Sequence, residues 1–198
     1  MKKVYFATGN KGKYGTLKDV LKQYGLKLIH QPMNFDKELD SEHLDEIAVD
    51  KVIRAYEKLK KPVISLDAGF YVKSLNGKPG AKINPFLKEH GIEGILKLLE
   101  GKGRFCEFKQ CLAYMGPDIS YPKIFESDVK GMISEEAMGC IESKPAWSKL
   151  WLIFIPEGEV KTIAEMDKKE YKVWRAKRGK DSIGAKFGTW YSFKKIKN

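Results

Sequence analysis

The sequence predicts a mixed α/β fold, in which helices flank a sheet that has both parallel and antiparallel strands. An apolar run at residues 4–7 leads into a glycine-containing turn and then an amphipathic helix, which is the pattern of a βα unit. Strands and helices alternate as β-α-β-α-β up to residue 67, which favours parallel pairing. Strands follow one another closely after Phe105, which favours antiparallel additions. The 198 residues suffice for one substantial core, so we expect a single domain spanning residues 1–198.

The individual elements follow from hydrophobic periodicity. Leu17, Val20, Leu21 and Tyr24 recur at helical spacing behind the first strand, so a helix is expected to begin near Gly12. Apolar runs bounded by turn residues predict strands at 3–7, 26–30, 62–67, 105–115, 122–131 and 150–155. Helical periodicity predicts helices at 13–24, 42–60 and 82–99, and a further helix somewhere within 167–182.

The turn at residues 8–13, Thr-Gly-Asn-Lys-Gly-Lys, has the composition of an anion site. It places a hydroxyl, an amide and ammonium groups at the N-terminus of the predicted helix, where backbone N–H groups and the helix dipole favour a phosphate. It is not a Walker loop, because Tyr14 stands where that pattern needs a glycine. The alternative interpretation is an ordinary βα turn with solvated lysines.

The positive charge of the chain is concentrated near its C-terminus. The net charge is +11, and residues 168–198 contribute +9 of it, with eleven Lys or Arg against Glu170 and Asp181. Such a segment can be a solvated face, an electrostatic funnel for nucleoside triphosphates or a nucleic-acid footprint. Aromatic residues are interleaved with this charge, and we expect Phe187, Trp190 and Tyr191 to pack in a core rather than to stack on bases.

Composition argues against membrane, secreted and zinc-binding classes. No stretch approaches the roughly 18 uninterrupted apolar residues of a membrane span, and residues 1–3 lead straight into a strand, so we expect a cytoplasmic protein. Cys106, Cys111 and Cys140 are odd in number and lack C-x-x-C spacing, which favours buried reduced thiols over disulfides or a zinc site.

The histidines are spread along the chain without a metal-binding pattern. His30, His43 and His90 stand far apart in sequence, and none belongs to a grouping such as H-E-x-x-H. We therefore interpret all three as surface or core residues rather than as ligands.

Collinear motifs run from residue 3 to about residue 187. Residues 8–13 fit the pattern [ST]-x-N-x-x-K, Glu46 and Lys51 fit a helical E-x-x-x-x-K segment, and residues 62–69 resemble a strand ending in E/D-D-[ST]-G. Further matches are an L-x-G-x-P-G turn at 75–80, apolar helices at 86–87 and 94–99, F-x-P-x-G followed by T-x-A-E-M at 154–166, and K-x(5)-R-G-K at 172–180. In this order and spacing the motifs resemble those of the inosine triphosphate pyrophosphatase family, also called Ham1-like.

The resemblance implies an elongated mixed sheet in two lobes around an active-site cleft, usually in a homodimer. It also implies Mg²⁺-dependent attack of water on the α-phosphorus of a nucleoside triphosphate, which releases the monophosphate and pyrophosphate. Asp67 is then the expected general base and, with Glu46, a metal ligand, while Lys13 and Lys51 are expected to complete the catalytic set. The expected substrate-binding residues are Thr8, Asn10, Lys13, Ser148, Trp151, Lys172, Lys177 and Arg178.

Departures from the family pattern concentrate where the nucleobase is held. Ser148 and Trp151 replace the stacking phenylalanine and the base-pairing aspartate, Ala176 and Lys177 replace Ser-His, and Leu66 and Ala68 replace one acidic and one hydroxyl residue. We therefore expect a base preference shifted away from inosine and xanthosine triphosphates. A second interpretation is a catalytically weak or inactive descendant that binds a nucleotide or nucleic acid. Retention of Glu46, Lys51 and Asp67 favours the enzyme, whereas the loss of an acidic residue at position 66 favours the alternative.

Overall fold

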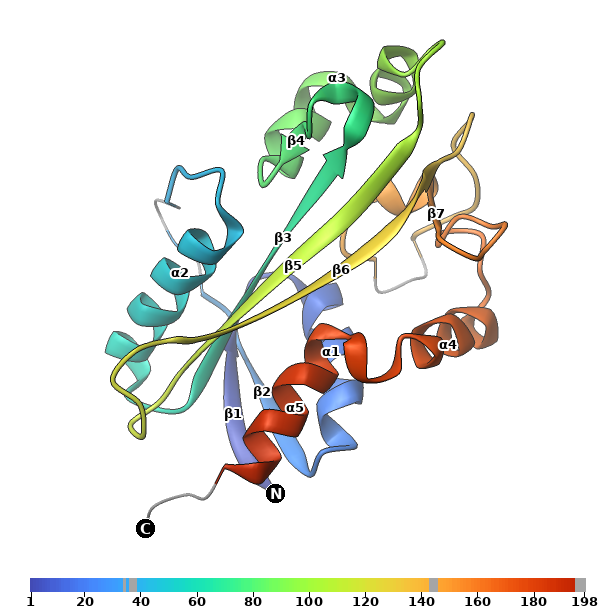
Figure 1. Cartoon of the computed structure of the whole chain (residues 1–198). Coiled ribbons are helices and arrows are strands. Elements are labelled where there is room, and N and C mark those ends of the chain that lie inside the picture. The colour runs from blue at the N-terminus through green and yellow to red at the C-terminus, as the bar shows by residue number, and fades with distance from the viewer. Residues whose placement is uncertain (34, 36–38, 143–145, 195–198) are drawn as a thin grey trace. The chain divides into compact units, whose positions relative to one another are not determined.

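The computed structural model describes residues 1–33, 35, 39–142 and 146–194, and in them strands and helices alternate from the N-terminus onward (Figure 1). The strands are β1 (Lys2–Ala7), β2 (Leu26–Gln31), β3 (Val63–Val72), β4 (Pro79–Gly80), β5 (Phe105–Met115), β6 (Lys123–Ile133) and β7 (Phe154–Pro156). The α-helices are α1 (Lys11–Lys22), α2 (Leu44–Leu59), α3 (Ile83–Leu98), α4 (Lys168–Lys177) and α5 (Ile183–Phe193). Short 3-10 helices span η1 (Lys73–Leu75), η2 (Lys149–Leu152) and η3 (Gly179–Asp181).

In the part of the chain that the structure describes, the strands form one mixed sheet of seven strands. Its order is β2-β1-β3-β5-β6-β7, and β4 pairs with β3. β1 is parallel to both β2 and β3, whereas β4 is antiparallel to β3 and β7 is antiparallel to β6. The predicted mixed α/β class, with a parallel N-terminal portion and later antiparallel strands, is confirmed.

The chain divides into two compact units. Unit 1 comprises residues 1–67, 110–127 and, as far as they are described, 179–198. Unit 2 comprises residues 68–109 and 128–178. Strands β3, β5 and β6 each contribute residues to both units. A single domain over residues 1–198 stays a prediction.

Unit 1 holds the βαβαβ start of the chain. β1 lies between β2 and β3, so the two crossovers run in opposite directions along the sheet. Figure 1 shows α1 and α2 on opposite faces of the strands, which is the arrangement expected of two right-handed crossovers that run in opposite directions. The strand side chains Val4, Phe6 and Ile64 are fully buried between these layers.

Helix α5 packs against α1 in unit 1 through two glycines. A Cβ atom on Gly188 would lie 2.6 Å from the ring of Tyr24, and one on Gly184 would lie 3.0 Å from Val20. The distance at Gly188 is shorter than real carbon contacts allow, and the distance at Gly184 is tighter than most of them. The glycines therefore permit the close approach of the two helices.

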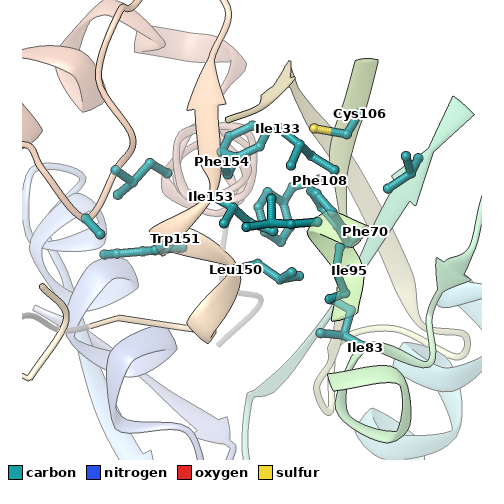
Figure 2. Packing of buried hydrophobic residues seen from close by; sticks show 14 of the residues in the cluster. Phe70, Ile83, Ile95, Cys106, Phe108, Ile133, Leu150, Trp151, Ile153 and Phe154 are labelled. Carbon is teal, nitrogen blue, oxygen red and sulfur yellow. The ribbon is translucent and has the colours of Figure 1, made fainter. Parts of the chain in front are cut away.

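Unit 2 is built around a cluster of aliphatic and aromatic side chains (Figure 2). Phe70, Phe108 and Phe154 form its aromatic centre, with ring centroids 4.6 to 6.1 Å apart. Helix α3 covers this cluster with buried side chains that include Ile83 and Ile95. The cluster gives unit 2 its own hydrophobic core.

Two sequence predictions about elements are wrong. The apolar segment at 150–155 was expected to be a strand, but residues 149–152 form η2 and only residues 154–156 form strand β7. Ser148 begins η2 by accepting a hydrogen bond from the Leu150 N–H at 3.2 Å. The predicted strand at 62–67 is also too short, because β3 continues to Val72.

Helix α5 is absent from the sequence prediction. Ser182 starts it, with a side chain that accepts from the Ala185 N–H at 3.4 Å. Phe187 and Tyr191 are buried on its inner face, which confirms core packing for these two residues, and Trp190 is half-buried beside them. Lys195 and Lys197 of the basic segment lie outside the described residues.

The cysteines are all free. Cys106 and Cys111 are buried as predicted, but Cys140 is exposed, because it lies in a loop rather than on a strand. Among the residues that the structure describes, no helix has the length and apolar character needed to cross a membrane.

Candidate active site

The turn between β1 and α1 places the residues of the predicted anion site at a capped helix N-terminus. Asn10 is the N-cap of α1, and its Oδ1 accepts a hydrogen bond from the Lys13 N–H at 2.9 Å. The Asn10 N–H in turn donates to Oγ1 of Thr8 at 3.0 Å, and Thr8 is buried. Helix α1 thus begins at Lys11, next to the predicted position, and its N-terminal amides face the end of β1.

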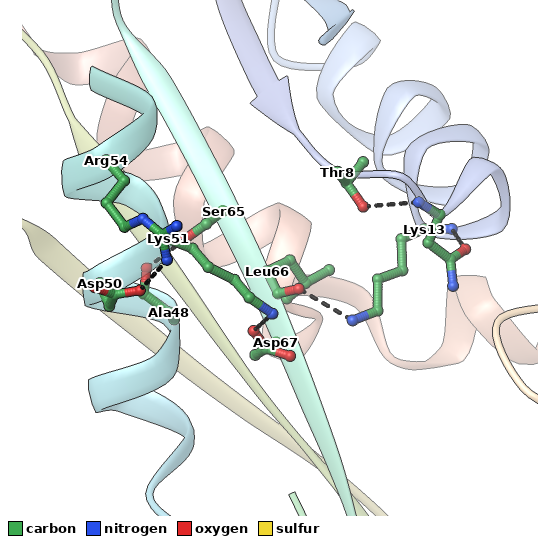
Figure 3. Close-up of polar contacts among 10 residues, drawn as sticks. Thr8, Lys13, Ala48, Asp50, Lys51, Arg54, Ser65, Leu66 and Asp67 are labelled. Carbon is green, nitrogen blue, oxygen red and sulfur yellow. Dashed lines mark hydrogen bonds and ion pairs between the residues drawn. The ribbon is translucent and has the colours of Figure 1, made fainter. Parts of the chain in front are cut away.

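Two lysines meet the polar part of β3 from different helices (Figure 3). Lys13 of α1 donates from Nζ to the carbonyl oxygen of Leu66 at 3.0 Å. Lys51 of α2 lies 2.6 Å from Oδ2 of Asp67, with 11% of the Lys51 side chain and 16% of the Asp67 side chain exposed. The structure therefore brings together Lys13, Lys51 and Asp67, the three residues predicted to be catalytic.

A buried hydroxyl fixes α2 against β3. Ser65 is fully buried and donates to the carbonyl oxygen of Ala48 at 2.6 Å (Figure 3). Ala48 lies one turn before Lys51 on α2. The bond therefore sets the separation of α2 and β3 that the Lys51 side chain spans to reach Asp67. Sequence reasoning assigned no role to Ser65, and the one signal for it was a polar residue inside an apolar strand.

Glu46 lies on the exposed side of α2. Its Oε2 accepts a hydrogen bond from the Ser41 hydroxyl at 2.6 Å. Lys51 lies about 140° around the helix from Glu46, and the buried position of Lys51 fits this separation. The two predicted metal ligands, Glu46 and Asp67, stand on separate elements, α2 and β3.

The pKa of the Cys111 thiol is affected by burial and by nearby carboxylates. Burial, followed by the charges of Glu126, Asp45 and Asp67, raises the pKa of Cys111 to about 12. The thiol is therefore neutral at physiological pH. Asp45, which stands next to Glu46 on α2, is one of the carboxylates whose charge acts on this thiol.

The remaining predicted binding residues belong to unit 2. Lys177 forms an ion pair with Glu159 at 2.7 Å, Arg178 donates to the carbonyl oxygen of Asp128 at 3.2 Å, and Lys172 is exposed on α4. Trp151 is only 5% exposed and packs in the hydrophobic cluster against Tyr171, with ring centroids 5.4 Å apart.

The family of the chain is settled by comparison with known proteins. A model of the Ham1 family matches residues 4–179. The chain belongs to the Ham1 family. The family resemblance predicted from the motifs is thereby confirmed.

Two relatives of this Ham1 chain bear the name dITP/XTP pyrophosphatase. The protein of Methanopyrus kandleri is 40% identical over 169 residues, which cover 85% of this chain and 86% of the relative. The protein of Saccharolobus solfataricus is 37% identical over 172 residues, which cover 85% and 84%.

Solved Ham1 structures share the fold. A HAM1 protein from Coxiella burnetii superposes with a TM-score of 0.71 at 21% identity, covering 97% of each chain. The Staphylococcus aureus Ham1 protein gives a TM-score of 0.66 at 23% identity, covering 98% of this chain and 100% of the other.

The described part of the Ham1 chain has no large cluster of metal-binding side chains. Within residues 1–33, 35, 39–142 and 146–194, no three His, Cys, Asp or Glu side chains gather into a group that could hold one. Mg²⁺ needs fewer, because it is commonly held by one or two carboxylates together with waters and substrate phosphates. The carboxylate oxygens of Glu46 and Asp67 have the right chemistry for that arrangement.

Proposed function

We propose that this Ham1 chain is a nucleoside triphosphate pyrophosphohydrolase, which converts a ribo- or deoxyribonucleoside triphosphate into the monophosphate and pyrophosphate. The observation that carries the proposal is the ion pair between Lys51 of α2 and Asp67 of β3, with Lys13 hydrogen-bonded to the carbonyl oxygen of the neighbouring Leu66. In hydrolysis of a phosphoanhydride a carboxylate can act as the base, and ammonium groups and a helix N-terminus can stabilise the negative charge of the phosphates. The names of the two relatives support the same reaction.

In this mechanism Asp67 is the general base. Its carboxylate takes a proton from a water molecule, whose oxygen bonds to the α-phosphorus as the bond from that phosphorus to the bridging oxygen breaks. Pyrophosphate leaves with the bridging oxygen. The hydrogen bond from Lys51 orients the Asp67 carboxylate for this proton transfer.

The phosphates are held by the turn and by the two lysines. Thr8 and Asn10 supply polar groups at the N-terminus of α1, and Lys13 and Lys51 offset the negative charge that builds up on the phosphate oxygens. On the basis of the family resemblance, Lys172, Lys177 and Arg178 are further proposed substrate contacts.

Mg²⁺ is the proposed metal cofactor, with Glu46 and Asp67 as its protein ligands. When bound, it would neutralise phosphate charge and lower the pKa of a coordinated water. Leu66 is 4% exposed and has no side-chain oxygen to offer in place of the acidic residue expected there, so this chain depends on Asp67 in that part of β3.

We propose a nonstandard or modified nucleotide as the substrate. The dITP/XTP names of the relatives support a nonstandard purine. Ser148, Trp151 and Lys177 stand where the family resemblance expects the base to be read, and their identities support a preference different from that of inosine triphosphate. A homodimer, a cytoplasmic location and a single domain over residues 1–198 complete the proposal.

The second candidate function is nucleotide or nucleic-acid binding without turnover. The replacement of an acidic residue by Leu66 is the observation that favours it. Measured turnover separates the two candidates directly.

The test is a panel of ordinary and modified nucleoside triphosphates, incubated with Mg²⁺ and assayed separately for pyrophosphate and for orthophosphate. We expect stoichiometric pyrophosphate and monophosphate from at least one nonstandard nucleotide. Release of orthophosphate from the γ-position would show a different reaction, and binding of the whole panel without any product would favour the second candidate.

A further inference from the structure

His30 lies directly behind the phosphate-binding turn, near the end of β2. Its Nε2 atom lies 2.8 Å from the carbonyl oxygen of Thr8. A carbonyl oxygen can only accept a hydrogen bond, so Nε2 must carry the proton. The Thr8 N–H donates to the carbonyl oxygen of Gln31 at 3.2 Å, so β2 holds the Thr8 backbone through both its N–H and its carbonyl group.

The imidazole is itself held by helix α1. The Tyr14 ring stacks on His30, with centroids 4.6 Å apart and an interplanar angle of 22°. The Tyr14 hydroxyl donates to the carbonyl oxygen of Leu28 at 3.5 Å. The imidazole therefore connects three parts of unit 1, namely α1, β2 and the turn that follows β1.

The contact with Thr8 reaches the whole turn through a short chain of bonds. The Thr8 hydroxyl accepts from the Asn10 N–H, and the Asn10 side chain accepts from the Lys13 N–H. The orientation of the Thr8 residue thus fixes the cap of α1 and the start of the Lys13 side chain.

We propose that His30 is a positioning residue for the phosphate-binding turn, acting through the Thr8 carbonyl as an Nε2–H donor. This inference rests on the proposed function, because it takes the turn as the place where the phosphates bind. His30 does not itself touch the phosphates. Its role is to hold the turn in its binding geometry before the substrate arrives.

The substitution His30→Leu removes the donor and keeps an apolar side chain beside Tyr14. We expect it to weaken binding of inorganic pyrophosphate, and to raise KM for the best nucleotide, by about 3- to 10-fold, as for one lost neutral hydrogen bond. The value of kcat should stay within about twofold, because the Lys51–Asp67 pair is untouched. His30→Gln restores an N–H at similar reach and should recover most of the affinity.

The experiment is a calorimetric titration of wild-type, His30→Leu and His30→Gln protein with inorganic pyrophosphate, together with urea unfolding of each. His90→Leu is the matched control, because His90 lies on α3 in unit 2, beside Phe86 and Glu89. Unchanged affinity in His30→Leu, or equal loss in both His30 variants, would overturn the proposal. If wild-type protein binds no pyrophosphate and turns over no nucleotide, the proposed function itself is wrong.

A spectroscopic measurement on unmutated protein covers the case in which His30→Leu does not fold. Nitrogen-15 NMR distinguishes a protonated Nε2 from a bare one in a neutral imidazole. We expect His30 as the Nε2–H tautomer, and a His30 with a proton only on Nδ1 would contradict the role.

Discussion

The Lys51 ammonium reaches from α2 across to β3 and lies 2.6 Å from the carboxylate of Asp67, with both side chains largely withdrawn from water. An ion pair so covered stabilises little by itself, since desolvation of both groups offsets most of the attraction. The ion pair instead fixes the orientation of the Asp67 carboxylate, next to the buried N-terminal half of β3.

Replacing Asp67 by asparagine should abolish most of the turnover and leave nucleotide binding measurable. The change removes the base, whose contribution is about 10²- to 10⁴-fold in rate, but keeps the lysines and the turn. Single-turnover kinetics and equilibrium binding of the same nucleotide check the two parts. Asp50→Asn is the matched control, because Asp50 lies on the same helix as Lys51 and pairs with Arg54 at 3.2 Å. A variant at position 67 that keeps most of its rate would reduce Asp67 to a structural residue.

Replacing Ser65 by alanine should lower the free energy of unfolding by about 1–3 kcal/mol, because the buried carbonyl of Ala48 loses its donor. Urea unfolding measures the change. Ser74→Ala is the control, since Ser74 also donates to a backbone carbonyl but in an exposed position, where the cost should stay within about 0.5 kcal/mol. Equal costs in the two variants would show that Ser65 does not anchor α2.

Trp151→Asp restores the acceptor that the family resemblance expects in the base site, and from the sequence alone it should raise relative activity toward inosine triphosphate. The variant must first remain folded, because Trp151 is packed among core side chains. We expect the substitution to cost about 3–5 kcal/mol of stability, as for other large losses from a core. Thermal unfolding of Trp151→Asp and of the milder Trp151→Phe measures this cost. A stable Trp151→Asp protein with unchanged selectivity would exclude position 151 from base recognition.

Asp118 should make the stability of unit 1 sensitive to acid. Burial acts to raise the pKa of Asp118, but hydrogen bonds from Lys194 and Tyr114 outweigh burial and hold this pKa below its ordinary value of 3.8. A lowered folded-state pKa stabilises the fold above pH 3.8, and this contribution is lost as pH falls through the folded-state pKa.

The measurement for Asp118 is urea unfolding of wild-type and Asp118→Asn protein between neutral pH and a pH well below the ordinary pKa of an aspartate. The difference in unfolding free energy should be present at neutral pH and disappear at the acid end. A difference that is constant over the whole range would mean that the charge of Asp118 does not matter.

The parts of the site that lie in short continuous motifs could be predicted from sequence. The start of α1 is one example, because the helical spacing of Leu17, Val20 and Leu21 placed it near Gly12, and the helix begins at Lys11. The family resemblance named Lys51 and Asp67 as catalytic residues, and their contact is seen only in the structure. His30 could not be found in this way, because its role depends on the register between β1 and β2, in which it stands opposite Phe6.

The elements that were missed owe their structure to tertiary packing. Helix α5 is rich in glycine and aromatic residues, which have weak helix propensity, and it is stabilised by burial of Phe187 and Tyr191. The segment around Trp151 has the apolar composition of a strand. Its capped 3-10 turn instead directs Leu150 and Trp151 into the core of unit 2.

The glycines of α5 affect how a harmful substitution at their positions would be interpreted in a binding experiment. Gly184 lets α5 pack closely on Val20 of α1, and Gly188 lets it pack on Tyr24 just after that helix. The first turn of α1 begins the proposed anion site. A bulkier residue at Gly188 would push against the Tyr24 ring, just beyond the C-terminal end of α1, although no residue of the turn itself is changed. Such a variant would lose ligand binding as a substitution in the turn would, although the changed residue lies near the other end of the sequence.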